Sequence, residues 1–483
     1  MSERKIITFL KIFSKIELKG FQQYLNSGLV KEEKQMIELL SLLKPIVRRK
    51  EIVLDWETKI GQQLFPLAKS PVNRLEQRCS QLKSYAEQFL IIQHIQTDTD
   101  QKQQWLLKTL QARKAINAYK YAEAEVLRRL ERQPTRDIAY HQISFELSHQ
   151  QHINPHLQIY STKNAAAEIA MDHADYLFVL NKLRYSCELY AKEQVLVKSY
   201  PIKLLAEAQA LATSEWGLKN PLLKLYNKIL YFHQYADATE GFQEIINDFM
   251  THRSLLGQVE QTFVLSNLMN LANWRLQLDR PTFLEVLSEL YDIGLKINVF
   301  IIDGVLSDTT FLNILANKAE IQKHGEVVNL MDKYQSFLLE KYRETALDFG
   351  QAYIHFYKNE YKAAMDILEE IKSPNFAYRC RKNTMLMVCY IELHHLEGFK
   401  PLNMEKSITN FQRFLNRQAK KTLQPNRIQR YKNFIKMVNA IKRKIWDFKT
   451  PIQEKERVDL MEKLEKNKPL VGESWLLKKI GEL

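Results

Sequence analysis

The chain has 483 residues, 13 glycines, 13 prolines and a formal net charge of +14. Glycine and proline fall well below their usual shares of about 7% and 5%, which argues against β-sandwiches, barrels and nucleotide-binding sheets. No two glycines lie closer than eight residues, which excludes the dinucleotide-binding, Walker A and nucleophile-elbow motifs, whose tight turns need closely spaced glycines.

The first predicted element is an amphipathic helix at the start of the sequence. Its apolar run is interrupted by Lys11 and is not followed by a small-residue cleavage site, so it does not resemble a secretory signal. The most apolar long stretch, residues 283–302, carries charged residues that are costly in hydrocarbon: Glu285, Glu289, Asp292 and Lys296. We therefore expect no membrane segment and a cytoplasmic location.

Helices are predicted along nearly the whole chain, because apolar residues recur at intervals of three and four. Within residues 71–95, one helix face would carry Leu75, Cys79, Leu82, Ala86, Phe89 and Ile92. Similar stripes follow at Ile116, Tyr119, Ala122, Val126 and Leu130, at Val264, Leu268 and Leu271, and at Ile428, Tyr431, Ile435, Val438, Ile441 and Ile445. Prolines separate helices of ordinary length, and Pro221 and Pro281 suit first-turn positions.

One segment, residues 297–306, resembles a strand pair, with Asp303-Gly304 as a possible hairpin turn. Against the hairpin, Ser307 or Asp308 could cap a helix that follows directly. The sequence favours the helix over the hairpin.

Two short motifs resemble the second helix of a tetratricopeptide repeat, where a small alanine lets a neighbouring helix approach closely. Tyr361, Ala364 and Leu368 form one motif, and Tyr235, Ala238 and Phe242 form the other. The two copies lie 126 residues apart, which is not a multiple of the usual repeat length, and the characteristic residues of the first helix are missing. These features indicate degenerate repeats.

The predicted fold class is all-α, with antiparallel helical hairpins stacked into a tetratricopeptide-like α-solenoid, or superhelix. An N-terminal helical region would span residues 1–96, the repeat array residues 97–400, and basic C-terminal helices packed on the array residues 401–483. The four cysteines lack the spacing of a zinc knuckle or a redox dithiol, so they are expected to be buried thiols.

Several short segments resemble those of a family of uncharacterised bacterial helical-repeat proteins of similar length. They are Phe13–Ser27, Lys182–Glu188, Phe311–Ile314, Phe411–Leu415 and Asn433–Ile435. The resemblance covers most of the chain and implies a helical fold. It implies no activity, because that family has none assigned.

The sharpest metal-binding candidate is His149, His152 and His156, whose spacing of three and four would place three imidazoles on one helix face. Asn154-Pro155 breaks that helix before His156, and the alternative is a solvated, glutamine-rich helix end. Residues 171–176 also bring carboxylates near an imidazole, as acid–base catalysis requires. Charged residues make up 26% of the chain, so such adjacency often arises by chance, and a solvated helix face is the favoured interpretation. The sequence favours the structural alternatives and predicts no cofactor.

Positive charge is concentrated near the C-terminus. Residues 413–449 contain twelve Lys or Arg and one acidic residue, so they supply +11 of the total +14. On the helix predicted after Pro425, Lys432, Lys436 and Arg443 would share one polar face opposite the apolar stripe. This face could bind nucleic acid or another polyanion, or it could be solvated or pair with an acidic partner.

Stacked helical hairpins usually hold peptides, partner proteins or other subunits. The sequence therefore predicts a non-enzymatic scaffold that binds other proteins or peptides. A regulatory protein that binds nucleic acid or a polyanion through its basic C-terminal region is the first alternative. An enzyme with an unfamiliar helical active site is the second, because helical bundles also host metal and acid–base chemistry.

Overall fold

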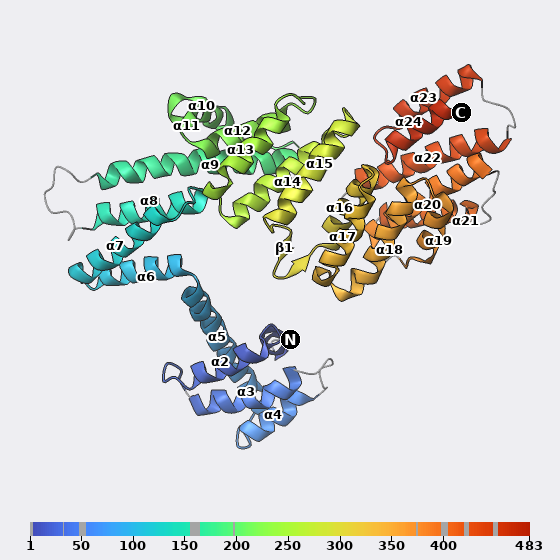
Figure 1. Ribbon diagram of the computed structural model, residues 1–483. Coiled ribbons are helices and arrows are strands. Elements are labelled where there is room, and N and C mark those ends of the chain that lie inside the picture. The colour runs from blue at the N-terminus through green and yellow to red at the C-terminus, as the bar shows by residue number, and fades with distance from the viewer. Residues whose placement is uncertain are drawn as a thin grey trace. The chain divides into compact units, whose positions relative to one another are not determined.

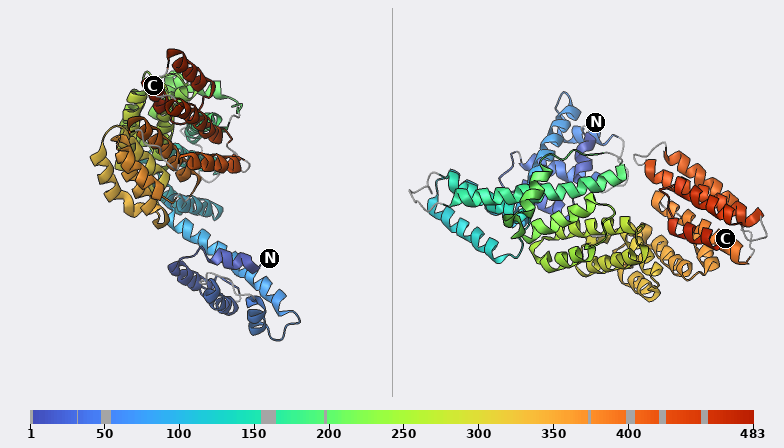
Figure 2. Two further views of the ribbon diagram at one scale, coloured as in Figure 1. Left: turned by 90° about the vertical axis from the view of Figure 1, so that its right-hand side faces the viewer. Right: turned by 90° about the horizontal axis from the view of Figure 1, so that it is seen from above.

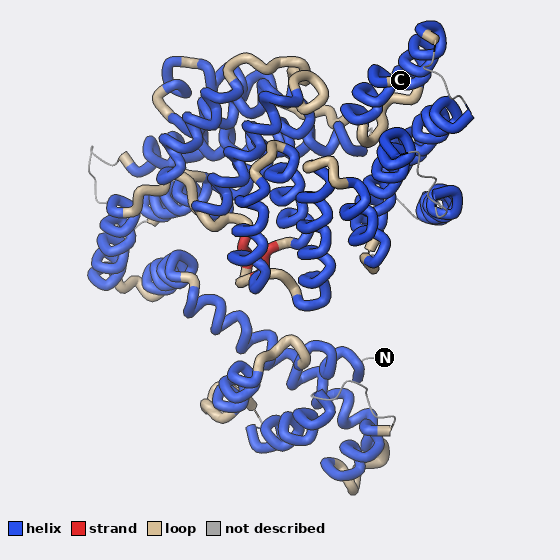
Figure 3. The backbone as a smooth tube through the Cα atoms, turned by 45° about the vertical axis from the view of Figure 1, so that its right-hand side comes forward, coloured by secondary structure: helices blue, strands red, loops and turns tan. Residues whose placement is uncertain are grey.

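The computed structural model describes residues 3–31, 33–47, 55–154, 165–196, 199–372, 375–397, 404–419, 425–447 and 453–483. Within these residues the protein is 81% helical, with 24 α-helices and one pair of very short strands (Figure 1, Figure 3). The predicted all-α fold class is confirmed.

The chain forms two compact units. Unit 1 comprises Met1–Arg132 and Leu147–Ala166, and unit 2 comprises Gln133–Glu146 and Ala167–Leu483. The helix α8 (Ile138–Ile153) contributes to both units. The domain limits predicted near residues 96 and 400 remain predictions.

Unit 1 is organised around one long helix, α5. The helices that precede α8 are α1 (Glu3–Leu10), α2 (Lys15–Leu25), α3 (Glu33–Val47), α4 (Trp56–Leu64), α5 (Pro71–Thr97), α6 (Thr99–Ala112) and α7 (Ile116–Arg132). The stripe predicted on α5 is buried from Leu75 to Phe89, where α1, α2, α3 and α4 pack against it, and Ile92 is 37% exposed. The predicted helix face is therefore confirmed over about four turns.

Unit 2 contains the remaining helices and both strands. They are α9 (Ala166–Leu196), α10 (Leu205–Thr213), α11 (Glu215–Leu218), α12 (Pro221–Gln234), α13 (Phe242–His252), α14 (Gln258–Arg275), α15 (Arg280–Lys296), β1 (Ile301–Ile302), β2 (Val305–Leu306), α16 (Asp308–Glu320), α17 (His324–Tyr334), α18 (Glu340–Tyr357), α19 (Tyr361–Glu370), α20 (Phe376–Glu397), α21 (Met404–Ala419), α22 (Pro425–Asp447), α23 (Glu454–Lys466) and α24 (Glu473–Glu482). Two short 3₁₀ helices span Arg253–Leu255 and Gln335–Phe337.

Helices of unit 2 pack mainly on their neighbours in the chain. The helix α16 contacts α17 and α18, α18 contacts α19, and α19 contacts α20, so helical hairpins follow one another (Figure 1, Figure 2). Local signals set the helix starts: Asn220 accepts hydrogen bonds from two backbone amides at the start of α12, and Asp279 accepts one at the start of α15. Pro221 and Pro281 occupy the first turns, as predicted.

The two tetratricopeptide-like motifs have different outcomes. Tyr361, Ala364 and Leu368 lie on α19, with Ala364 and Leu368 fully buried. Tyr235, Ala238 and Phe242 do not form a helix, so the interpretation of that segment was wrong: residues 235–241 form the connection between α12 and α13.

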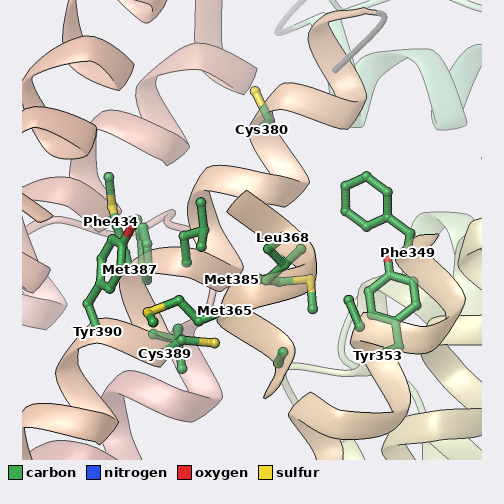
Figure 4. Packing of buried hydrophobic residues seen from close by; sticks show 14 of the residues in the cluster. Phe349, Tyr353, Met365, Leu368, Cys380, Met385, Met387, Cys389, Tyr390 and Phe434 are labelled. Carbon is green, nitrogen blue, oxygen red and sulfur yellow. The ribbon is translucent and has the colours of Figure 1, made fainter. Parts of the chain in front are cut away.

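The largest core lies in the C-terminal part of unit 2. Around α18, α19, α20 and α22 it contains the sulfur-bearing side chains Met365, Cys380, Met385, Met387 and Cys389 and the aromatic side chains Phe349, Tyr353, Tyr390 and Phe434 (Figure 4). All four cysteines of the chain are buried, as expected. Burial raises the pKa of the Cys380 thiol to about 12, so this thiol stays protonated and unreactive at neutral pH.

The segment between α15 and α16 contains both of the structures that the sequence posed as alternatives. The hairpin pairs Ile301 with Leu306 and Ile302 with Val305, and α16 begins directly afterwards at Asp308. The expected helix is therefore confirmed, whereas rejecting the hairpin was wrong. Positive φ angles of 51° at Asp303 and 77° at Gly304 form the two-residue turn that matches the twist of paired strands.

Replacing Gly304 with alanine tests this turn. A Cβ atom at Gly304 would meet no atom within 4 Å, so the cost comes only from its left-handed backbone and should be about 1–2 kcal/mol. Gly325→Ala is the control, because that position also has open space but lies in α17 without a positive φ; it should be neutral or stabilise by up to about 1 kcal/mol. Equal unfolding free energies for the two variants in urea titrations would contradict the assigned turn.

Candidate functional site

The predicted histidine cluster is only partly placed. His149 and His152 are exposed on α8, and His156 lies outside the described residues. Over the residues that the structure describes, no group of three or more His, Cys, Asp or Glu side chains could hold a metal ion. These positions are therefore not assigned as a metal centre.

The predicted basic face is present on α22, opposite the buried side of the helix. Lys436 and Arg443 are exposed and Lys432 is half-buried, whereas Ile428, Ile435, Val438 and Ile441 are buried. Two neighbouring cations on α22 form ion pairs: Lys442 pairs with Glu405, and Lys444 pairs with Glu456.

A groove runs along α9 in unit 2. It has a volume of about 550 Å³. Its lining residues come from the end of the unit 2 part of α8, from α9 and from the segment before α10: Phe145, Ala174, Leu177, Phe178, Asn181, Lys182, Tyr185, Ser186, Leu189 and Ile202. We call this cavity the α9 groove. Its volume lies within the range of about 300–1,000 Å³ that is usual for ligand sites.

The helix α9 is apolar on two opposite faces. On one face Val179, Leu180, Leu183 and Cys187 are fully buried in the core of unit 2. On the other, Met171, Phe178 and Tyr185 are 68%, 37% and 54% exposed. A second apolar face on a helix whose first is already buried is normally covered by a partner, so the exposed face has the composition of a binding surface.

The exposed face has the spacing of a coiled-coil seam. Met171, Phe178 and Tyr185 are seven residues apart, and Ala174 and Asn181 occupy the intermediate positions. This is the a/d pattern through which one helix packs against another. From Met171 to Tyr185 the seam is about 21 Å long.

Polar groups beside the seam provide charge. Lys182, which lines the groove, and Asp175 are seven residues apart, one position after the seam residues Asn181 and Ala174. Neither forms an ion pair with any described residue. The Lys182 ammonium lies 5.9 Å from the centre of the Phe178 ring, so positive charge is held beside an exposed aromatic side chain.

Polar contacts join α9 to the neighbouring helices α12 and α14. The Arg184 Nε donates to Glu260 Oε1 at 3.0 Å and to Oε2 at 3.2 Å, and the Tyr226 hydroxyl donates to the same carboxylate. These residues come from α9, α14 and α12. The largely buried Arg184–Glu260 pair ties α9 to α14 through charge-assisted hydrogen bonds.

One hydrogen bond joins α8 to α9 near the groove. The Nδ1 atoms of His141 on α8 and His173 on α9 are 3.0 Å apart. Their ring centroids are 5.2 Å apart and the ring planes are inclined by 60°. His141 precedes the groove residue Phe145 by about one helical turn. We call this contact the histidine clasp.

The clasp requires at least one neutral imidazole. One ring donates its Nδ1 proton and the other accepts it, so two protonated rings would place two donors against each other. Burial, followed by the neighbouring His173, lowers the pKa of His141 to about 4, against a backbone hydrogen bond with Arg136 that raises it. Burial also lowers the pKa of His173, which Asp172 opposes.

The pairing of the two histidines also bears on the acid–base hypothesis for residues 171–176. The structure pairs His173 with His141, while Asp172 and Asp175 are exposed. Sequence reasoning did not identify the α9 groove or the clasp. The seven-residue spacing of Met171, Phe178 and Tyr185, together with a second apolar face, was the available signal.

Comparisons with protein families, with curated proteins and with solved structures found no match. Among the described residues, none of the helices combines the length and the apolar character needed to cross a bilayer.

Proposed function

We propose that this protein is a scaffold of the degenerate tetratricopeptide-like type that binds a partner protein. The α9 groove receives one amphipathic helix of that partner. The observation that carries the proposal is the exposed a/d seam on a helix whose opposite face is already buried in the core. The succession of helical hairpins in unit 2 supports the solenoid part of the proposal.

The seam specifies the partner's chemistry. Phe178 and Tyr185 supply aromatic anchors, and a partner helix would cover them with apolar residues at its own a and d positions. Asp175 and Lys182 would face a basic and an acidic residue of the partner, respectively, which would fix its register and orientation. The occupant is therefore a helix of about four turns with one apolar stripe and a flanking acid–base pair.

Two double variants test the proposal by co-purification from native cells. Phe178→Asp with Tyr185→Asp places two carboxylates on the seam and should lower the partner's affinity by at least about 30-fold, the effect of losing one central anchor. Tyr231→Asp with Tyr235→Asp is the matched control, because those side chains are 46% and 54% exposed in the same unit. The control should retain the partner.

The partner's binding segment completes the test. A synthetic peptide of that segment should become helical on binding to the intact protein and should compete with the whole partner. An unchanged set of partners after the seam substitutions would contradict the proposal. So would a peptide that binds in an extended form, or sedimentation showing that a second copy of this chain occupies the seam.

A further inference from the structure

The outward face of α22 forms a strip of hydrogen-bond donors. Lys432, Lys436, Asn439 and Arg443 follow one another at spacings of four, three and four, opposite the buried stripe of the same helix. We call these four residues the α22 strip. It is about 16 Å long, from Lys432 to Arg443.

The cations of the strip have no carboxylate partner among the described residues, unlike two cations beside them. Glu405 on α21 pairs with Lys442, and Glu456 on α23 pairs with Lys444 at 2.5 Å, so two cations beside the strip are compensated. Among the described residues, no carboxylate pairs with the three cations of the strip itself. Packed against α22, α21 adds the exposed cations Arg413 and Arg417.

We propose that the α22 strip binds the phosphodiester backbone of a nucleic acid. Each side chain of the strip donates hydrogen bonds, and lysine, arginine and asparagine are the residues that commonly contact phosphate oxygens. A protein partner would need apolar or aromatic anchors at the centre of its interface, and the strip has none. A polyanion recognised by charge and hydrogen bonds alone fits this surface.

This binding is independent of the proposed scaffold function. The α22 strip lies on the helices of the C-terminal core, whereas the α9 groove lies on the separate core built around α9, α12 and α14. A loss of nucleic-acid binding therefore leaves the scaffold proposal intact, and the reverse also holds.

Fluorescence anisotropy with a labelled 30-base-pair duplex and a labelled 30-nucleotide single strand tests the proposal. Three phosphate contacts contribute about −2.7 to the slope of log affinity against log salt for a duplex, or about a 40-fold loss between 50 and 200 mM salt. The intact chain should show at least this slope. The triple variant K432E/K436E/R443E should bind at least about tenfold more weakly at 100 mM salt, with a slope reduced by about 2–3.

The control variant makes the same change in net charge at three other positions. K203E/K224E/K296E replaces three exposed lysines of unit 2 and should keep most of the affinity and the full slope. Equal losses in the two triple variants would mean that only net charge matters and would overturn the proposal. Binding of the intact chain to polyglutamate but to neither nucleic acid would also overturn it, in favour of an acidic protein partner.

A second measurement does not depend on the triple variant folding. Lysine acetylation of the intact chain, read by mass spectrometry, should slow at Lys432 and Lys436 when the duplex is present. Lys224 and Lys296 should react at unchanged rates. Uniform protection of all four lysines, or protection of none, would contradict a site on α22.

Discussion

Arg275→Ala is expected to destabilise unit 2 by about 4 kcal/mol, because several buried carbonyl groups lose their donor at once. Arg275 is fully buried, and burial lowers its pKa only to about 10, so the guanidinium stays charged. Its Nη2 donates to Phe232 and Tyr235 carbonyls at 2.9 Å each, Nη1 to the Leu271 carbonyl at 3.2 Å, and Nε to the Ala238 carbonyl. These bonds terminate α12 and shape the connection to α13.

Urea unfolding with matched variants measures this effect. Arg280→Ala removes a partly exposed arginine that pairs with Glu320 and should cost about 1 kcal/mol or less. Arg275→Lys keeps the charge but not the planar set of donors, so it should fall between the two. Similar losses for Arg275→Ala and Arg280→Ala would contradict the role given to Arg275.

Acidification from pH 7 to pH 4 is expected to destabilise unit 2 by about 3 kcal/mol for each of two buried histidines. Burial lowers the pKa values of His141 and His233 to about 4, and in His233 a hydrogen bond to Asn267 opposes this shift. The unfolded chain binds a proton at each site below about pH 6.5, whereas the folded chain does not until about pH 4. Stability is therefore fully present above pH 6.5 and is lost as the pH falls towards 4.

Histidine variants separate this effect from the titration of carboxylates. His141→Gln should make the pH dependence of the unfolding free energy shallower by about 3 kcal/mol over this range, whatever its own stability at pH 7. His149→Gln, at an exposed position of the same helix, should leave the wild-type profile unchanged. A parallel profile for His141→Gln would show that the histidine clasp is not the acid-sensitive contact.

The helix faces could be predicted from the sequence because they depend on local periodicity. Leu75 and Leu82 on α5, and Ile435 and Ile441 on α22, are buried as their spacing indicates. The outward face of α22 follows from the same rule. The same rule cannot predict which cations beside this face are neutralised, because the partner of Lys442, Glu405, lies on a preceding helix.

Features that depend on distant contacts could not be predicted. The motif at Tyr235 and Ala238 has helical spacing, but Arg275, about forty residues later, takes the backbone carbonyls of both residues. In the same way, the histidine clasp joins His141 and His173 across 32 residues. The α9 groove is completed by Phe145 and Ile202, which come from other segments of the chain. The sequence pattern of α9 alone does not distinguish its buried face from its exposed one.

Site-specific photo-crosslinking in native cells tests the binding role of the α9 seam most directly. A photoreactive phenylalanine at Tyr185 is compared with the same residue at Tyr235, since both tyrosines are 54% exposed in unit 2. We predict that position 185 crosslinks one partner through a single helical segment, and that position 235 does not crosslink that segment. The same crosslinks from both positions, or no protein crosslink at position 185, would contradict a helix-binding seam on α9.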